Sequence, residues 1–503
     1  MTFPWLTFLG LLPIIGGLLL FLPMGKGAAR ILGLVFSVAT LAVGVTVAVL
    51  HGTGADLSVA VPWIRAFGAW WALGVDGMGL AMILLTVVLT PLVLLAEWEP
   101  PAGRWSAQSF FALVLILEGL ALFVFTSTDV LLFYLFFEAT LIPTYFLIVG
   151  FGGERRGFAA IKFLLFSLAG GLIMLASVVG LFAVSASQGT PSYLIGDLAA
   201  LRIDGDLGRW LMLGFLVAFI IKAPMVPLHT WLPDTAAQST PGTATLLVGV
   251  LDKIGTFGMI RFCLGLFPEA SVWVAPFMTV FAVISILWGA LAAIGSTNMM
   301  RMVAYTSVSH FGFMVLGLYA FTTTSQTGSI FYMLNHGFST AALFLIVGFL
   351  AKRRGSYDID AYGGVQKVAP VAAGVLLLAG LSALSLPGMA TFVSEFLVIA
   401  GSWTRNPVIT VFALPGVVFA AVYVLAILYK RTMTGPVTEQ SEKAFTGRDL
   451  TGIEKAVMVP IIAMLLFFGF VPQPAVSMVE PTAKATMEYV GVTDPAPVVK
   501  GAK

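Results

Sequence analysis

Apolar residues occur in this chain as long continuous runs, and these runs constrain its fold more than any other feature. Each run can cross the hydrocarbon core of a bilayer as a helix, which takes about 20 residues, and we count about fourteen of them. Runs of this length favour helices over the short alternating strands of a membrane barrel. The sequence therefore predicts an all-α polytopic membrane protein. The runs lie near 3–22, 30–50, 77–96, 109–127, 129–150, 160–184, 209–226, 242–265, 272–295, 302–320, 329–350, 371–402, 408–429 and 455–471.

The composition excludes several other classes of protein. Charged residues make up 10% of the 503 residues, against about 25% in ordinary globular domains, so a water-soluble globular protein is excluded. A net charge of +2 gives no reason to expect a nucleic-acid partner. One cysteine (Cys263) excludes a Cys-ligated iron–sulfur cluster within this chain, and four histidines leave little material for haem or metal ligation. We therefore expect no cofactor and no metal in this chain, and an energy source in an ion gradient or in partner proteins.

The basic residues predict the orientation in the membrane. If the N-terminus is on the outer side, 16 of the 26 Lys and Arg fall in inner loops and 7 in outer segments. The inner set includes Arg104 and the cluster 352–354, and the outer set includes Lys500 and Lys503. Because positive residues accumulate on the cytoplasmic side, we expect both termini on the outer side.

Three basic residues remain outside both loop sets, and four acids also fall within the apolar runs, where each mid-span charge costs at least ~2.5–3.5 kcal/mol on insertion scales. At ~1.5 Å per residue, Glu118 and Glu138 lie ~15 Å from the membrane surface. By the same rise, Lys222 and Lys253 lie ~18 Å from it. Two histidines, His310 and His336, lie ~12–15 Å into their own runs. The ionisable groups thus form a layer near the midplane. The seven are Glu118, Glu138, Lys222, Asp252, Lys253, Arg261 and Glu395.

Structural explanations exist for some of these residues. Arg261 is close to a helix end, where a long side chain can extend to the membrane surface. Asp252 can simply neutralise Lys253, although adjacent residues do not share a helix face. Histidines in helices are often satisfied polar groups of the core. Two acids and two lysines at one depth are harder to explain structurally, and burial disfavours their charged forms, so a nearby charge can switch their protonation.

Two apolar runs are interrupted beside ionisable residues. Three prolines follow Lys222 within 224–233, and Pro387-Gly388 precedes Glu395. Proline lacks an N–H and clashes with the preceding turn, so both helices are predicted to break there. Paired broken helices are typical of transporters built from two related halves, although simple proline kinks remain an alternative.

Several stretches combine these charged residues with prolines, glycines and aromatic residues. They resemble the signature motifs of the antiporter-like subunits of respiratory complex I, and the resemblance covers about 75–430. Phe136-Phe-Glu138-Ala-Thr-Leu-Ile-Pro143 is similar to the glutamate helix of the M-type chains, and Glu395 stands where L-type and N-type chains carry lysine. The tail 472–503 contains prolines and is predicted to lack the long lateral helix of the L-type chains. The signature stretches are Lys222-Ala-Pro-Met-Val-Pro-Leu-His-Thr-Trp-Leu-Pro-Asp234, Asp252-Lys-Ile-Gly255, Arg301-Met-Val-Ala-Tyr-Thr-Ser-Val-Ser-His310 and Phe331-Tyr-Met-Leu-Asn-His336.

The resemblance implies an architecture and a function. It implies two inverted five-helix repeats, at 109–265 and 272–430, after three helices in 1–108 and before a last helix in 431–503. It implies a proton-translocating subunit of an NADH–quinone oxidoreductase in a bacterial inner membrane, beside L-type and N-type chains. NADH, FMN, iron–sulfur clusters and quinone would be bound by partner subunits. The implied roles are a pair of Glu138 with Lys222, a central relay of Lys253, His310 and His336, an outlet at Glu395, and a second acid at Glu118.

Three alternatives stay open at this point. A subunit of a Mrp-type cation/proton antiporter and a subunit of a membrane-bound hydrogenase contain the same kind of module. A scaffolding membrane subunit is the third, but it does not explain a midplane layer of charge.

Overall fold

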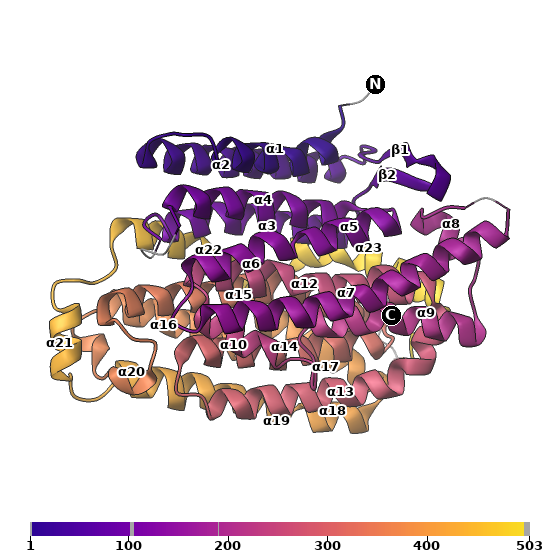
Figure 1. Cartoon of the computed structure of the whole chain (residues 1–503). Coiled ribbons are helices and arrows are strands. Elements are labelled where there is room, and N and C mark those ends of the chain that lie inside the picture. Colours follow the sequence, from indigo (N-terminus) through magenta and orange to yellow (C-terminus); the bar gives the residue numbers. More distant parts are fainter. Residues whose placement is uncertain (1–2, 101–104, 190, 497–503) are drawn as a thin grey trace. The chain divides into compact units, whose positions relative to one another are not determined.

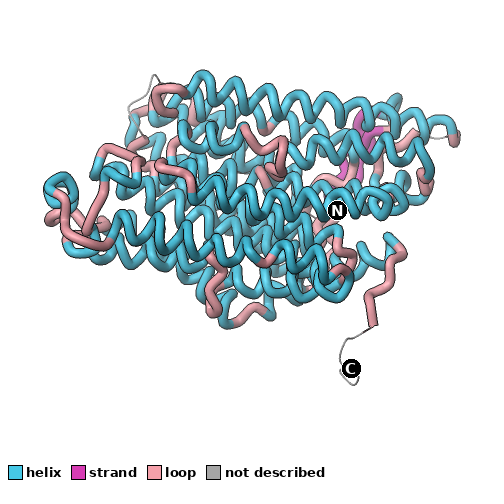
Figure 2. The backbone as a smooth tube through the Cα atoms, turned by 90° about the horizontal axis from the view of Figure 1, so that it is seen from below, coloured by secondary structure: helices cyan, strands magenta, loops and turns pink. Residues whose placement is uncertain are grey.

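The computed structural model describes residues 3–100, 105–189 and 191–496. Helices dominate these ranges, as the cyan tube of Figure 2 shows. Within them, ten helices are long and apolar enough to cross a membrane, and Trp5–Leu19 and Pro370–Ala383 are shorter apolar helices. The prediction of a polytopic helical membrane protein is therefore confirmed. Three residues used to predict the orientation, Arg104, Lys500 and Lys503, lie outside the described residues.

The chain divides into two compact units, and unit 1 comprises Met1–Ala223, Val250–Val274 and Glu488–Gly491. Its elements are α1 (Trp5–Leu19), α2 (Lys26–Gly52), β1 (Val59–Ile64), β2 (Ala69–Leu73), α3 (Gly77–Ala96), α4 (Ala107–Thr126), α5 (Val130–Ala139), α6 (Leu141–Phe151), α7 (Arg156–Ser187), α8 (Ile195–Ala200), α9 (Gly205–Lys222) and α12 (Lys253–Gly258) (Figure 1).

Unit 2 comprises Pro224–Gly249, Ala275–Met487 and Val492–Lys503. Two helices, α13 (Pro268–Ile294) and α23 (Gln473–Val490), begin in one unit and end in the other. The helices wholly inside unit 2 are α10 (Trp231–Gln238), α11 (Pro241–Leu246), α14 (Met299–Tyr319), α15 (Thr323–Arg354), α16 (Pro370–Ala383), α17 (Ala390–Arg405), α18 (Pro407–Ala413), α19 (Pro415–Ala421), α20 (Lys430–Met433), α21 (Glu439–Phe445) and α22 (Gly452–Phe470).

Side-chain caps define where many of these helices begin. In unit 1, the Asp76 carboxylate accepts a hydrogen bond from the Gly79 N–H at 2.8 Å, and Asp129 accepts one from the Leu132 N–H at 2.9 Å. In unit 2, Asn298 caps α14 through the Arg301 N–H at 3.0 Å. Each cap satisfies a backbone donor that the first helical turn leaves without a partner, which matters most where lipid surrounds the helix.

The surface of α7 is inverted relative to that of a soluble helix. Its large apolar side chains Leu165 and Leu172 are exposed, whereas Ser167, Gly170 and Gly171 face the interior. Small residues at helix contacts and large apolar residues outside are the pattern expected of a helix in lipid. By contrast, α15 is buried from Ser325 through Ala351 and forms the core of unit 2.

Both predicted helix breaks are confirmed. Helix α9 ends at Lys222, two residues before Pro224, and the second run stops at Ala383 and resumes at Ala390. A third break was not predicted: the run 129–150 divides at Thr140 into α5 and α6. Pro143 explains it, because its ring and missing N–H disrupt the bond to the carbonyl four residues earlier, next to Glu138.

The run 242–265 is not a uniform α-helix. Two π-helical segments, Leu247–Leu251 and Met259–Leu264, flank the short helix α12, which carries Lys253. A π-helical turn inserts one extra residue and redirects the side chains that follow, and such turns are frequent at functional sites.

One local prediction needs correction, and the tail forms a helix that the sequence did not indicate. The all-α prediction missed a hairpin in which β1 pairs antiparallel with β2, with Val59 opposite Leu73 (magenta in Figure 2). Its turn needs Gly68, whose φ of 64° is favourable for glycine. The tail after 472, predicted to lack a long lateral helix, forms the 18-residue helix α23. Apolar residues at every fourth position, from Ala475 to Met487, bury one face of that helix.

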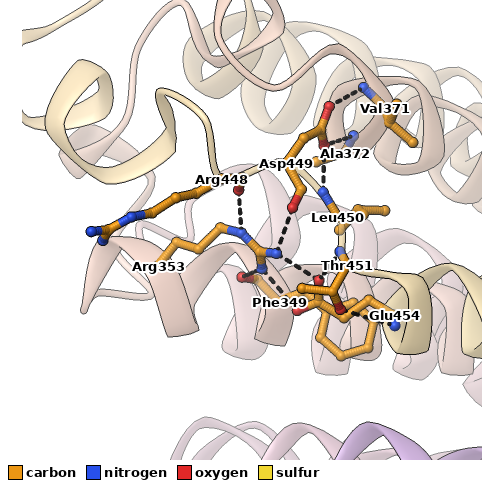
Figure 3. A network of polar contacts seen from close by, with 9 residues as sticks. All are labelled: Phe349, Arg353, Val371, Ala372, Arg448, Asp449, Leu450, Thr451 and Glu454. Atoms are coloured by element: carbon orange, nitrogen blue, oxygen red, sulfur yellow. Dashed lines mark hydrogen bonds and ion pairs between the residues drawn. The ribbon is translucent and has the colours of Figure 1, made fainter.

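A polar network joins three helix ends within unit 2 (Figure 3). The Arg353 guanidinium, near the end of α15, binds the Glu454 carboxylate in the first turn of α22 through two bonds of 2.8 and 2.6 Å. It also donates to the carbonyl oxygens of Phe349, Arg448 and Asp449. The side chains of this ion pair are only 10% and 9% exposed, so the pair is bidentate and nearly buried.

The same network fixes the start of α16. The Asp449 carboxylate accepts hydrogen bonds of 2.9 Å from the backbone N–H groups of Val371 and Ala372. In addition, Thr451 and Glu454 form a reciprocal capping box at the start of α22. The network therefore determines the relative positions of α15, α16 and α22.

Candidate functional site

Lys222 lies at the end of α9 and is almost completely buried, with 1% of its surface exposed. Its Nζ lies 5.3 Å from the ring centres of both Phe137 and Phe163. It interacts electrostatically with Asp252 and, more weakly, with Glu138. The structure places Glu138 within electrostatic range of Lys222 without a hydrogen bond to its Nζ among the described residues, and adds aromatic rings that stabilise a buried ammonium.

A pair of glycines on α7 makes room for the Glu138 side chain. A Cβ atom at Gly171 would overlap the Glu138 carboxyl group, so that carboxyl group lies directly against the α7 backbone. A Cβ at Gly170 would lie 3.1 Å from the Cα of Ala218 and 2.9 Å from Ile221 on α9. Helix α7 therefore approaches α9 closely while admitting the glutamate from α5.

A second pair of glycines packs α12 against α9. A Cβ at Gly255 would clash with the backbone of Ala223 and Phe219, and a Cβ at Gly258 would clash with the Phe219 ring. This packing places Lys253, which has no exposed surface, beside the end of α9. Lys253 interacts electrostatically with Asp252.

Glu118 and Arg261, the two remaining charged residues of the predicted set in unit 1, have other neighbours. Glu118 on α4 is buried, and its polar neighbour is the Thr90 hydroxyl of α3, so it groups with α3 rather than with Lys222. Arg261 was expected to extend to the membrane surface. Its guanidinium pairs with Asp76, the N-cap residue of α3, at 2.9 Å. Burial tends to raise the pKa of Asp76, but Arg261 and the Gly79 N–H outweigh burial and hold that pKa below its usual value.

Unit 2 contains a separate cluster around the two histidines. The ring centres of His310 on α14 and His336 on α15 are 5.1 Å apart, and both rings are buried. His310 Nε2 lies 3.0 Å from the carbonyl oxygen of Ala383, the last residue of α16, and 3.4 Å from the Tyr423 hydroxyl. The last carbonyl oxygen of the first half of the broken helix therefore contacts His310, a histidine of the predicted relay.

Glu395, in the second half of the same broken helix, has two hydroxyl donors. Tyr332 donates to its Oε2 at 2.8 Å, and Ser385 donates to the same oxygen at 2.7 Å. Ser385 lies in the break and has a φ of 55°, a left-handed conformation that non-glycine residues rarely adopt. Unit 2 thus joins His310, Tyr332, His336 and Glu395 into one buried polar cluster.

Comparison with known proteins identifies the family. Residues 127–422, more than half of the chain, match the family model described as NADH:quinone oxidoreductase/Mrp antiporter, TM. The chain is 46% identical to the NADH-quinone oxidoreductase subunit M of Mycobacterium tuberculosis, over 99% of this chain and 96% of that protein. The chain belongs to this family of membrane subunits. The subunit M of Escherichia coli K12 is 34% identical over 94% and 95% of the two chains.

Solved structures agree with the assignment to this family. A chain of respiratory complex I from Thermus thermophilus with bound NADH superimposes with a TM-score of 0.88 and 31% identity, over 97% of this chain and all of that chain. A chain of the Mrp complex from Dietzia sp. superimposes with a TM-score of 0.85 at 20% identity, over 97% of this chain and all of that chain, which shows a shared fold.

Three residues in or next to the polar cluster of unit 2 were not predicted from the sequence. They are Tyr332, Ser385 and Tyr423. Tyr332 precedes His336 by four residues, so helical spacing alone places both on one face and could have indicated it. Ser385 lies just before Pro387 in the predicted break, where an unwound backbone exposes polar groups. Tyr423 lies in an apolar run and gives no signal in the sequence.

The described residues contain no group of three or more His, Cys, Asp and Glu side chains that could hold a metal ion. Cys263 is buried as a free thiol. The ionisable clusters are instead built of acids, lysines, histidines and tyrosines at helix breaks. Such groups can exchange protons with one another, because each exists in two protonation states whose balance depends on neighbouring charges.

Proposed function

We propose that the chain is a proton-translocating membrane subunit of an NADH–quinone oxidoreductase, and so part of a translocase that carries no redox chemistry of its own. Sequence identities of 46% and 34% to two curated subunits M, over 99% and 94% of this chain, support this assignment. The observation that carries it is the buried ionisable cluster at a helix break in each unit. NADH, FMN, iron–sulfur clusters and quinone would be bound by the partner subunits.

The proposed route begins at Glu138 and Lys222. A carboxylate close to Lys222 stabilises its ammonium, and withdrawal of that carboxylate destabilises the buried charge and releases its proton. Quinone reduction in partner subunits would supply the charge change that moves Glu138. The proton would then pass to Lys253, to the histidine pair and to Glu395 as the outlet, with Glu118 as a second acid.

We also propose the finer architecture that the sequence implies. It has about fourteen spans when interrupted helices are counted as single crossings of a ~30 Å core. Two inverted five-helix repeats, at 109–265 and 272–430, follow the helices of 1–108 and precede the segment 431–503. Both termini lie on the outer side of a bacterial inner membrane, and L-type and N-type antiporter-like chains are its neighbours.

The alternative function is a subunit of a Mrp-type cation/proton antiporter. The family description and the shared fold at 20% identity support it. The higher identity to subunits M along the whole chain favours the oxidoreductase.

Blue-native electrophoresis with staining for NADH oxidation tests the assignment. Membranes from cells that carry an epitope-tagged copy of the chain should show the tag in the large band that oxidises NADH, because the chain is assembled with redox subunits. Deletion of the chain should shift or remove that band. A tag that migrates in a complex without NADH oxidation would support the antiporter alternative instead.

A further inference from the structure

Asp252 is a fully buried carboxyl group to which the proposed route assigns no task. It has no exposed surface, and neither of its carboxyl oxygens has a hydrogen-bond partner among the described residues. A carboxyl group with no such bond is costly to bury unless opposite charge or a function compensates for it. Two buried lysines of unit 1, Lys222 and Lys253, supply that charge.

Asp252 acts on both lysines at once. Its strongest electrostatic partner is Lys253, followed by Lys222. Lys222, in turn, interacts electrostatically with both Asp252 and Glu138. The predicted pair of Glu138 and Lys222 is therefore part of a larger group in which Asp252 is the shared neighbour of the two lysines.

The fold explains how one carboxyl group can serve two lysines. Adjacent helical residues point about 100° apart, so Asp252 and Lys253 lie on different faces. Asp252 stands at the junction between the π-helical segment Leu247–Leu251 and α12, while the close contact of Gly255 with Ala223 brings this junction to the end of α9. Lys222 is the last residue of α9, so Asp252 lies near the ends of both lysine-bearing elements and interacts electrostatically with both amines.

Three other charged groups of unit 1 have different neighbours. Arg261 follows on the next π-helical segment and is paired with Asp76. Glu118, on α4, has Thr90 as its polar neighbour. Glu138, on α5, interacts electrostatically with Lys222.

We propose that Asp252 carries the proton from Lys222 to Lys253, a step that rests on the proposed function. The Lys222 ammonium donates its proton to the Asp252 carboxylate, which leaves a neutral amine and a carboxylic acid. The acid then donates the proton to the neutral Lys253 amine, which regenerates the carboxylate and forms an ammonium. Because no hydrogen bond joins these groups in the structure, each transfer needs rotation of a lysine side chain or one bridging water molecule.

The test uses the assembled oxidoreductase in proteoliposomes and measures protons translocated per NADH oxidised. Four single variants are compared: Asp252→Asn, Asp252→Glu, Lys222→Ala and, as a control in the same run of sequence, Cys263→Ala. Asp252→Asn should lower the ratio to that of Lys222→Ala, and the double variant should fall no further, because both residues serve one step. Asp252→Glu should restore the ratio, and Cys263→Ala should leave it unchanged.

Each other outcome is decisive. A normal ratio in Asp252→Asn together with a lowered ratio in Lys222→Ala would overturn the role of Asp252 and leave the proposed function intact. Equal losses in Asp252→Asn and Asp252→Glu would assign Asp252 a structural role. A normal ratio in Lys222→Ala would overturn the proposed function itself. If Asp252→Asn does not assemble, Asp252→Leu replaces it, since it removes the buried polar atoms altogether.

Discussion

Glu395→Gln is expected to block proton release through unit 2 while the fold is retained. Glutamine keeps an oxygen that can accept the hydrogen bonds from Tyr332 and Ser385, so the buried cluster should stay in place. It cannot bind or release a proton, and loss of a positioned acid or base typically slows a reaction by about 10²–10⁴-fold. The rate of proton transfer through this subunit should fall by about that factor. The measurement is NADH-driven proton uptake in inverted membrane vesicles.

Glu439→Gln is the matched control for this experiment. Glu439 lies in α21, its side chain is 75% exposed, and it forms a surface ion pair with Lys443. Surface pairs of this kind contribute little to stability, so that variant should pump normally. Proton uptake by Glu395→Gln at the level of this control would exclude Glu395 as the outlet.

Arg353→Ala is expected to have the largest effect on stability. The substitution leaves the Glu454 carboxylate nearly buried without its partner and removes the donor to three carbonyl oxygens (Figure 3). Removing one member of a buried ion pair typically costs about 3–5 kcal/mol. We expect a lower thermal unfolding temperature of the purified complex and less of the chain in membranes.

Lys352→Ala supplies the comparison for that variant. Lys352 is the preceding residue on α15 and has an exposed side chain, so its loss removes a charge without opening the network. Equal unfolding temperatures for the two variants would mean that the Arg353–Glu454 pair does not hold the helix ends together.

Much of the helical framework was predictable from the sequence because lipid imposes simple requirements. Long apolar runs must be helical, and proline after Lys222 or before Glu395 must interrupt a helix. The same argument applies to Pro143, so the break beside Glu138 was within reach of the sequence. The hairpin at 59–73 was missed because short strands between membrane helices leave no long pattern.

The partners of the site residues were less predictable. Depth along a helix follows from counting residues, which is why Glu138 and Lys222 could be placed at one level. The bond between Tyr332 and Glu395 joins residues 63 positions apart, and its existence depends on how α15 packs against α17. From the sequence, Asp252 was predicted only to neutralise Lys253. The sequence shows neither the π-helical segment before Asp252 nor the packing of Gly255 against Ala223, next to Lys222.

The central claim is that the charged residues at the break of α9 move protons. It is tested most directly by the number of protons translocated per NADH oxidised, measured on assembled complexes carrying Lys222→Ala or Glu138→Ala. The account predicts a lower ratio in both variants, with both complexes still assembled, since each removes one member of the loading pair. A normal ratio in both variants would contradict it.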